Sequence, residues 1–262
     1  MNQLSAKNIT ISYPSGRKAI EPIKNLSLDA EKGELLFFIG VNGSGKSTLL
    51  RTLAGLQEPA SGEILWKGET LRNIPINERP LQTAYMFSQF NRVEGMKVLD
   101  LVALGRHPYT GRFGRVDEGD LEICMDVLKK VGLSDYSQRN TTSLSDGEFK
   151  KSLLAKLLAQ QCPLMILDEP TTHLDLPSEL SFLKLLKSES RQSGRTVILS
   201  THNLQAALKL ADRILILGKE SEYSLGTPDE IASGELMCDF LQSNELAIKN
   251  GNLIYDLKDE ES

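Results

Sequence analysis

The chain has 262 residues, of which 40% are hydrophobic and 25% are charged, and its formal net charge is −5. This length is enough to bury a full hydrophobic core, and the composition is that of an ordinary globular protein. The acidic balance argues against a protein that binds nucleic acid through overall positive charge, so we predict no nucleic-acid partner.

Cysteine usage and apolar runs bear on where the chain works. Cys124, Cys162 and Cys238 are widely spaced, which is typical of a reducing compartment. The first residues lack the basic start and apolar stretch of a signal peptide. The longest apolar run, Leu35–Ile39, is far shorter than the about 20 residues that cross a bilayer. We therefore expect a cytosolic chain whose membrane role, if any, depends on a partner.

Strand and helix patterns alternate along the chain. Short apolar runs with few polar residues predict strands that are buried on both faces: Leu35–Ile39, Ala84–Phe87, Leu164–Leu167, Thr196–Ser200 and Ile214–Leu217. Helical patterns cover Lys46–Leu56, Glu118–Val131, Asp146–Gln160, Leu180–Ser188 and Leu204–Ala211. Such alternation predicts an α/β fold with a largely parallel sheet.

Two parts of the chain depart from this alternation. The N-terminal part predicts antiparallel strands that flank the core. From about Phe90 to Gln160 the pattern is mostly helical, with a Gly/Arg-rich loop at Gly105–Arg115. We expect an α/β core with a β-subdomain formed by residues 1–88 and 161–262, and an inserted helical subdomain formed by residues 89–160.

Residues 40–47 read G-V-N-G-S-G-K-S and match the phosphate-binding pattern G-x-x-x-x-G-K-[ST], between an apolar strand and a helix. Glycines let backbone N–H groups approach phosphates, and the helix start adds a positive dipole end. The lysine supplies a cation for the β- and γ-phosphates, and the serine hydroxyl can ligate Mg²⁺. We predict that the triphosphate is bound by Gly40, Val41, Asn42, Gly43, Ser44, Gly45, Lys46, Ser47 and Thr48.

The predicted nucleotide is ATP. The guanine-reading element Asn-Lys-x-Asp does not occur in the sequence. Tyr13 precedes the loop by 27 residues and could stack on adenine. Taken alone, this tyrosine is more often a packed or surface residue.

Two acids and a histidine follow predicted strands. Asp168 and Glu169 come directly after Leu164–Leu167, and ligands bind at the carboxyl ends of strands in such sheets. Asp168 is placed to hold Mg²⁺ through water, and Glu169 to act as general base on the attacking water. The alternative is a solvated acidic turn. His202, after Thr196–Ser200, could contact the γ-phosphate and orient the water, although a lone histidine there is often an ordinary polar residue.

The segment L-S-D-G-E at Leu144–Glu148 resembles the L-S-G-G-Q signature motif of the ATP-binding cassette (ABC) family. The other motifs of that family then fall into order: Tyr13 as the adenine stack, Gln89 as the Q-loop, Asp168–Glu169 as the second Walker motif, Leu174–Asp175 as the D-loop and His202 as the switch histidine. The resemblance implies one ABC ATPase domain over residues 1–262, with a P-loop NTPase (RecA-like) core. It also implies that Glu169, His202 and Lys46 are catalytic, and that Mg²⁺ is held by Ser47, Gln89 and Asp168.

The resemblance further implies a homodimer that sandwiches ATP. In the family, the signature motif faces the γ-phosphate on the other subunit, so Ser145 and Gly147 of a second copy would complete the site. This chain departs from the motif at Asp146 and Glu148, which replace glycine and glutamine. Each adds a negative charge near an anion, unless its side chain points away or pairs with a cation.

Two further segments resemble the importer branch that handles iron–siderophore complexes, haem and cobalamin: V-A-L-G-R-H-P-Y at Val102–Tyr109 and P-T-T-H-L-D at Pro170–Asp175. This implies an ATPase at the cytoplasmic face of the inner (cell) membrane. A permease dimer would dock near Gln89–Arg115, with a substrate-binding protein as an indirect partner. The alternative is a soluble ABC ATPase in Fe–S assembly, translation or DNA metabolism. The 55 residues from Gln89 to Leu144 contain no heptads, which disfavours the class with a coiled-coil insertion there.

Overall fold

The computed structural model describes residues 2–15, 18–111, 114–218, 221–234, 237–238, 246–249 and 252–255. Its central sheet has the strand order β10-β9-β3-β8-β7-β6. The strands are β3 Leu35–Gly40, β6 Thr83–Met86, β7 Leu164–Leu167, β8 Thr196–Ser200, β9 Arg213–Leu217 and β10 Tyr223–Gly226. Among the described strands of this sheet, only β10 runs antiparallel to its neighbour, β9. The five predicted strands are therefore confirmed, with Phe87 lying just outside β6.

A second sheet covers one side of the core, as predicted for the N-terminal part. It has the order β2-β1-β4-β5 and is antiparallel. Its strands are β1 Asn2–Ser15, β2 Lys18–Glu31, β4 Ser61–Trp66 and β5 Glu69–Thr70. A separate pair is formed by β11 Leu246–Lys249 and β12 Asn252–Tyr255.

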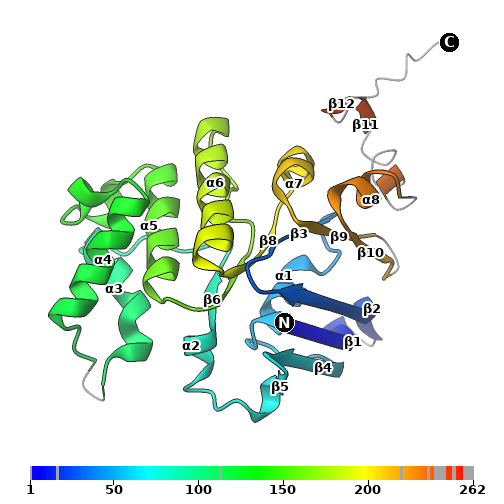
Figure 1. Cartoon of the computed structure of the whole chain (residues 1–262), viewed down its shortest axis with the longest axis horizontal. Helices are drawn as coiled ribbons and strands as arrows, with labels where there is room; N and C mark the ends of the chain where they lie inside the picture. Colours follow the sequence, from blue (N-terminus) through cyan, green and yellow to red (C-terminus); the bar gives the residue numbers. More distant parts are fainter. Residues whose placement is uncertain are drawn as a thin grey trace.

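Helices connect the parallel strands and form a layer beside them (Figure 1). They are α1 Lys46–Leu53, α2 Arg79–Gln82, α3 Val98–Ala103, α4 Glu118–Lys130, α5 Asp146–Ala159, α6 Leu176–Ser193, α7 Leu204–Leu210 and α8 Pro228–Ala232. Helix α1 ends before the predicted Leu56, because Gly55 turns the chain with φ +73° against Leu71. Helix α6 is longer than predicted, because the Asp175 side chain accepts a hydrogen bond from the Ser178 N–H and starts the helix earlier.

Alternate residues of β3 face two different hydrophobic cores. Leu35, Phe37 and Ile39 pack into the core shared with α3, α4, α5, α6 and α7. Leu36 and Phe38 pack into the core shared with α1 and the antiparallel sheet. All five side chains are buried, as predicted for a central strand covered on both faces.

Helices α3, α4 and α5 pack together on one side of the molecule (Figure 1). The predicted loop at Gly105–Arg115 is partly wrong, because Leu104–Tyr109 forms a 3₁₀ helix. Arg106 is buried, and it donates to Asp120 Oδ1 at 2.8 Å and to the Ala159 carbonyl at 2.7 Å. It therefore stabilises the helical layer and is not a surface residue. The subdomain division at residues 89 and 160 stays a prediction.

No helix in the described part of the chain is both long enough and apolar enough to cross a membrane.

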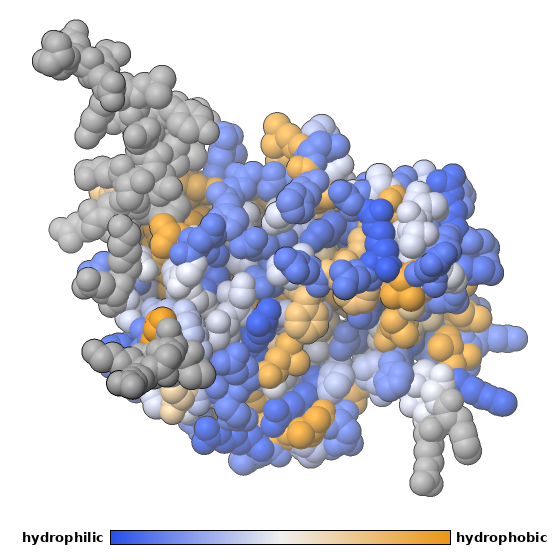
Figure 2. Space-filling view, turned by 180° about the vertical axis from the view of Figure 1, so that it is seen from behind, coloured by the Kyte–Doolittle hydropathy of each residue, from blue (hydrophilic) through white to orange (hydrophobic). Residues whose placement is uncertain are grey.

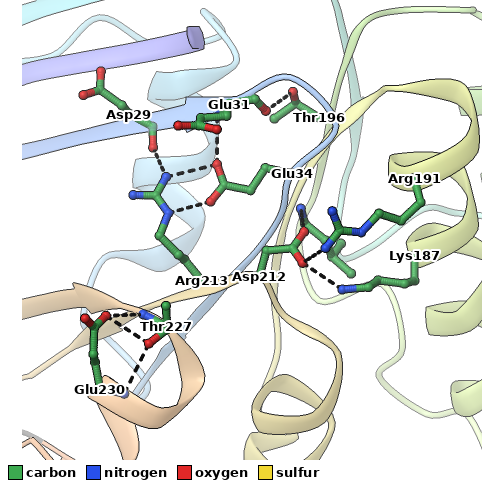
Figure 3. A network of polar contacts seen from close by, with 11 residues as sticks. Asp29, Glu31, Glu34, Lys187, Arg191, Thr196, Asp212, Arg213, Thr227 and Glu230 are labelled. Carbon is green, nitrogen blue, oxygen red and sulfur yellow. Dashed lines mark hydrogen bonds and ion pairs between the residues drawn. The ribbon is translucent and has the colours of Figure 1, made fainter. Parts of the chain in front are cut away.

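A polar network ties the start of the parallel strands to the flanking elements (Figure 3). Asp212, just before β9, accepts hydrogen bonds from the Leu35 N–H at 2.8 Å and Lys187 Nζ at 2.9 Å, and also pairs with Arg191. Arg213 donates to both carboxylate oxygens of Glu34, at 2.6 and 3.0 Å. The Glu34 hydrogen bonds raise the pKa of Arg213. The network thus fixes how β3 and β9 start relative to α6 and β2.

We predict that Glu34→Ala lowers the free energy of unfolding by about 2 kcal/mol, because it leaves Arg213 without its bidentate partner. The side chain of Glu34 is 8% exposed and that of Arg213 is 29% exposed. The measurement is urea-induced unfolding. As a control, Glu58→Ala removes an ion pair with Arg72 whose side chains are 59% and 63% exposed. We expect it to cost less than about 0.5 kcal/mol. Equal costs for the two variants would contradict the prediction.

Candidate active site

The phosphate-binding pattern forms the loop between β3 and α1. Gly45 has φ +91°, a conformation that favours glycine, and an added Cβ would lie 3.0 Å from Pro22 Cγ. At Gly40 a Cβ would lie 2.6 Å from the Leu217 carbonyl oxygen. Because Gly45 has no side chain to cap α1, the first N–H groups of that helix face the space above the loop and can bind an anion.

Lys46 lies inside this loop. It is 5% exposed, and its Nζ donates to the carbonyls of Gly40 at 2.7 Å and Val41 at 3.1 Å. Burial lowers its pKa, and the nearby carboxylates of Glu169 and Asp168 oppose that change. The ammonium group is therefore held between the loop and the two acids.

Asp168 directly follows β7 at the same edge of the sheet and is fully buried. Its Oδ1 accepts hydrogen bonds from Ser47 Oγ at 3.0 Å and Ser200 Oγ at 2.9 Å. Its Oδ2 is buried and, among the described residues, accepts none. A carboxylate with a free oxygen beside a serine hydroxyl suits Mg²⁺, which prefers oxygen ligands and keeps several waters. No cluster of three or more His, Cys, Asp or Glu side chains that could hold a metal occurs in the described ranges. Ser47 and Asp168 could therefore hold Mg²⁺ together with phosphate oxygens.

Glu169 is held in an uncommon backbone conformation, with φ 45°. Its N–H donates to Ser200 Oγ at 2.9 Å, and its Oε1 lies 2.8 Å from His202 Nε2. Thr172 Oγ1 donates to the other carboxylate oxygen at 3.4 Å. The structure therefore brings the predicted general base and the predicted switch histidine together and fixes the direction of the carboxylate.

Tyr13, from the antiparallel sheet, faces the same space. It lines one cavity together with Glu169 and the loop residues Asn42, Gly43, Gly45, Lys46, Ser47 and Thr48. The residues predicted to hold the base, the triphosphate and the attacking water are thus gathered in one place. The other predicted loop residues, Gly40, Val41 and Ser44, shape the loop and do not line this cavity.

Gln89 lines a neighbouring cavity that also contains Glu169. It is exposed, and it is not among the residues around the first cavity. Its assignment as a Mg²⁺ ligand stays a prediction.

The signature motif starts α5. Ser145 is the N-cap, since its Oγ accepts from the Glu148 N–H at 3.2 Å, and Glu148 Oε2 accepts from the Ser145 N–H at 2.8 Å. The backbone hydrogen bond from Ser145 is the main cause that lowers the pKa of Glu148. Asp146 pairs with Arg92 at 2.5 Å. One departure from the motif thus caps the helix, and the other pairs with a cation. Ser145 and Gly147 do not line the cavity around Tyr13, and their contact with a second copy stays a prediction.

Sequence reasoning missed Ser200. Its hydroxyl donates to Asp168 Oδ1 and accepts from the Glu169 N–H, so it holds both acids. The available signal was a serine at the end of a fully buried strand, where a polar group needs a partner.

Comparison with known proteins agrees with this geometry. The ABC transporter family model matches residues 23–172. The petrobactin import ATP-binding protein FpuD of Bacillus anthracis is 35% identical, over 90% of this chain and 85% of the relative.

Two solved structures from ABC transporters are also similar to this chain. A chain of a transporter described as metal-chelate type, in an inward-facing conformation, has a TM-score of 0.81 at 27% identity and covers 97% of this chain and 96% of its own length. The dimeric ATP-binding cassette MJ0796, bound to ADP and Pi after hydrolysis, has a TM-score of 0.73 at 27% identity and covers 84% and 97%. The chain therefore belongs to the ABC transporter family, as one of its ATP-binding subunits.

Proposed function

We propose that this chain is the ATP-hydrolysing subunit of an importer that takes up a metal chelate such as an iron–siderophore complex, haem or cobalamin. The observation that carries the proposal is the meeting of Lys46, Ser47, Asp168 and Glu169 at one edge of the sheet. The class of cargo rests on two relatives, one named for petrobactin import and one described as metal-chelate type.

Binding of ATP follows from the groups in the loop. Backbone N–H groups from Gly43 to Thr48 and the start of α1 bind the phosphate oxygens. Lys46 gives up its contacts with the loop carbonyls and binds the β- and γ-phosphates, so a buried cation meets an anion in a site of low dielectric. Tyr13 stacks on adenine.

Mg²⁺ would be held by the Ser47 hydroxyl and, through water, by Asp168, and Gln89 from the neighbouring cavity would be a third ligand. When bound, the ion would offset the negative charge of the triphosphate as the reaction proceeds. Ser200 keeps Asp168 Oδ1 in place, so that Oδ2 remains free to accept a hydrogen bond.

Hydrolysis uses the Glu169–His202 pair. Glu169 accepts a proton from the attacking water, and the new O–P bond forms as the bond to the leaving β-phosphate oxygen breaks. His202 lies 2.8 Å from Glu169 Oε1, and its side chain is 49% exposed, so it can orient the water and reach the γ-phosphate. The fixed backbone of Glu169 means that little reorganisation is needed before the reaction.

Two copies complete the site. The support is the MJ0796 cassette, which is dimeric with ADP and Pi bound. Ser145 and Gly147 of one copy face the γ-phosphate on the other, and the symmetric arrangement gives two equivalent sites. ATP then favours the closed dimer by binding it more tightly than the open one.

The permease docks on the segment near Gln89–Arg115, and this docking holds the chain at the cytoplasmic face of the membrane. A substrate-binding protein is an indirect partner, and the chain binds no nucleic acid. Val93, Leu104 and Tyr109 in this range are 47%, 44% and 42% exposed. Hydrophobic residues also gather on the helical-layer side in Figure 2. Residues 112 and 113 lie outside the described residues, and Arg106 is buried, so the apolar side chains rather than this arginine form the contact.

The alternative is an ABC ATPase that is not coupled to transport and acts in Fe–S assembly, translation or DNA metabolism. It shares the ATP chemistry above. It differs in its partner, which would be a soluble protein or nucleic acid and not a membrane permease.

We predict that Lys46→Ala weakens ATP binding by about 10- to 100-fold, because a charge-assisted contact worth about 1.5–3 kcal/mol is lost. Isothermal titration with MgATP measures the Kd. Lys97→Ala is the matched control, since Lys97 bonds to Gln138 on the exposed surface. An unchanged Kd for Lys46→Ala would mean that the loop does not bind the triphosphate as proposed.

We predict that Glu169→Gln lowers kcat by about 10²- to 10⁴-fold while ATP binding is kept, because glutamine has the shape of glutamate but cannot accept the proton. Phosphate release at saturating ATP measures kcat. The control Glu63→Gln changes an exposed glutamate that accepts a hydrogen bond from Thr70. Full turnover by Glu169→Gln would show that Glu169 is not the general base.

We predict that Val93→Glu combined with Leu104→Glu reduces recovery of the chain with its co-expressed permease in detergent, because charges then occupy the docking surface. ATP affinity should stay unchanged. Ile76→Glu is the matched control, since Ile76 is 79% exposed and lies outside the docking range. If the wild-type chain purifies without any membrane protein, the soluble alternative is favoured.

A further inference from the structure

One face of α5 is turned toward the segment that carries Gln89. Asp146, Phe149, Lys150 and Leu153 follow the helical spacing i, i+3, i+4 and i+7, and all of them line one cavity. The segment Ser88–Arg92 and Glu169 line the same cavity. The start of the signature helix and the Gln89 segment are therefore direct neighbours.

Arg92 makes two contacts with this face. Its Nη2 lies 2.5 Å from Asp146 Oδ1, and its Cζ lies 5.0 Å from the centre of the Phe149 ring. The first is an ion pair and the second is a cation–π contact. A glycine at position 146, as in the usual motif, would leave only the second.

The other end of the segment is also held. Lys150 Nζ donates to the Ser88 carbonyl at 3.3 Å. The Phe90 ring lies 6.2 Å from the Phe149 ring and 5.2 Å from Lys156 Nζ. Gln89 thus lies between residues that are bound to α5 on both sides, while its own side chain stays exposed toward the cavity.

We propose that Asp146 is a positioning residue, which holds the Gln89 segment against α5 through Arg92 so that the signature motif and Gln89 move together. This rests on the proposed function, in which Ser145 and Gly147 contact ATP on a second copy and Gln89 reaches Mg²⁺ in its own copy. Movement of α5 toward the second copy then also sets the position of Gln89. Asp146 acts without touching the nucleotide.

The size of the effect follows from the exposure of the pair. The side chains of Arg92 and Asp146 are 28% and 71% exposed, so the ion pair is partly screened by water. With the cation–π contact retained, we expect loss of the pair to lower kcat by about two- to fivefold and to leave the ATP Kd unchanged.

The test is a double-mutant cycle on the full chain, with kcat, KM and ATP Kd measured for Asp146→Gly, Arg92→Ala and the double variant. We expect a lower kcat at constant Kd for each single variant, and a double variant no slower than Arg92→Ala alone, because the two changes remove one interaction. Asp146→Glu should keep most of kcat, since it retains the charge. The control Arg72→Ala removes a surface ion pair with Glu58. Independent, multiplicative losses, or a normal kcat for Asp146→Gly, would overturn the proposal.

Hydrogen–deuterium exchange separates this proposal from the proposed function. Asp146→Gly should speed exchange at the amides of residues 88–92 relative to wild type and to Arg72→Ala, whether or not the chain hydrolyses ATP. Unchanged exchange in that segment means that Asp146 does not hold it. Faster exchange in a chain whose wild type lacks ATPase activity supports the contact and rejects only the proposed function.

Discussion

The parallel alignment of β3, β8 and β7 is the constraint on which the site depends. Phe38 pairs with Ser200, and Leu167 pairs with Leu199, so the carboxyl ends of the three strands lie at the same edge of the sheet. Because both faces of these strands are apolar, the hydrophobic pattern alone would tolerate a slip that exchanges the two faces. Polar contacts at the strand ends remove this freedom. At one end the Leu35 N–H bonds to Asp212, and at the other Ser200 bonds to Asp168. The same hydroxyl therefore helps set the register and places the carboxylate.

The strained backbone at Glu169 depends on that alignment. A non-glycine residue in the left-handed region costs about 1–3 kcal/mol and persists only where its surroundings hold it. Here Ser200 binds the N–H, and Thr172 and His202 bind the carboxylate. The buried strands supply the stability that keeps this conformation, and the conformation aims the carboxylate at the space above the loop. Stability and chemistry are thus linked through β8, whose last residue touches both acids.

Much of the fold and of the site could be predicted, because the signals were local. The loop at Gly40–Ser47 needs only the neighbouring residue types, and the strands before it and before Asp168 are continuous apolar runs. Arg106 could not be placed in this way. Its charge suggests a surface loop, but its partners are Asp120 and the Ala159 carbonyl, 14 and 53 residues further along the chain. Ser200 was missed for the same reason, since its role exists only once β7 and β8 lie side by side. Whether such a polar residue is buried, and which group it binds, depends on partners that are distant in the sequence.

The two acids in the signature motif, Asp146 and Glu148, differ in how far away in the sequence their partners lie. Glu148 acts locally, because it accepts from the N–H of Ser145, three residues earlier, and its lowered pKa keeps it ionised. Asp146 acts at long range, because its partner Arg92 lies 54 residues earlier in the chain. An anion that approaches the start of α5 would meet two carboxylates if neither were paired. Arg92 offsets the charge of Asp146, and a nearby Arg139 also favours the ionised form of Glu148. Each acid at the start of α5 therefore has an arginine nearby that offsets its charge. The ion pair with Arg92 accounts for an acid where the motif has glycine, and under our proposal the same contact holds the Gln89 segment against α5.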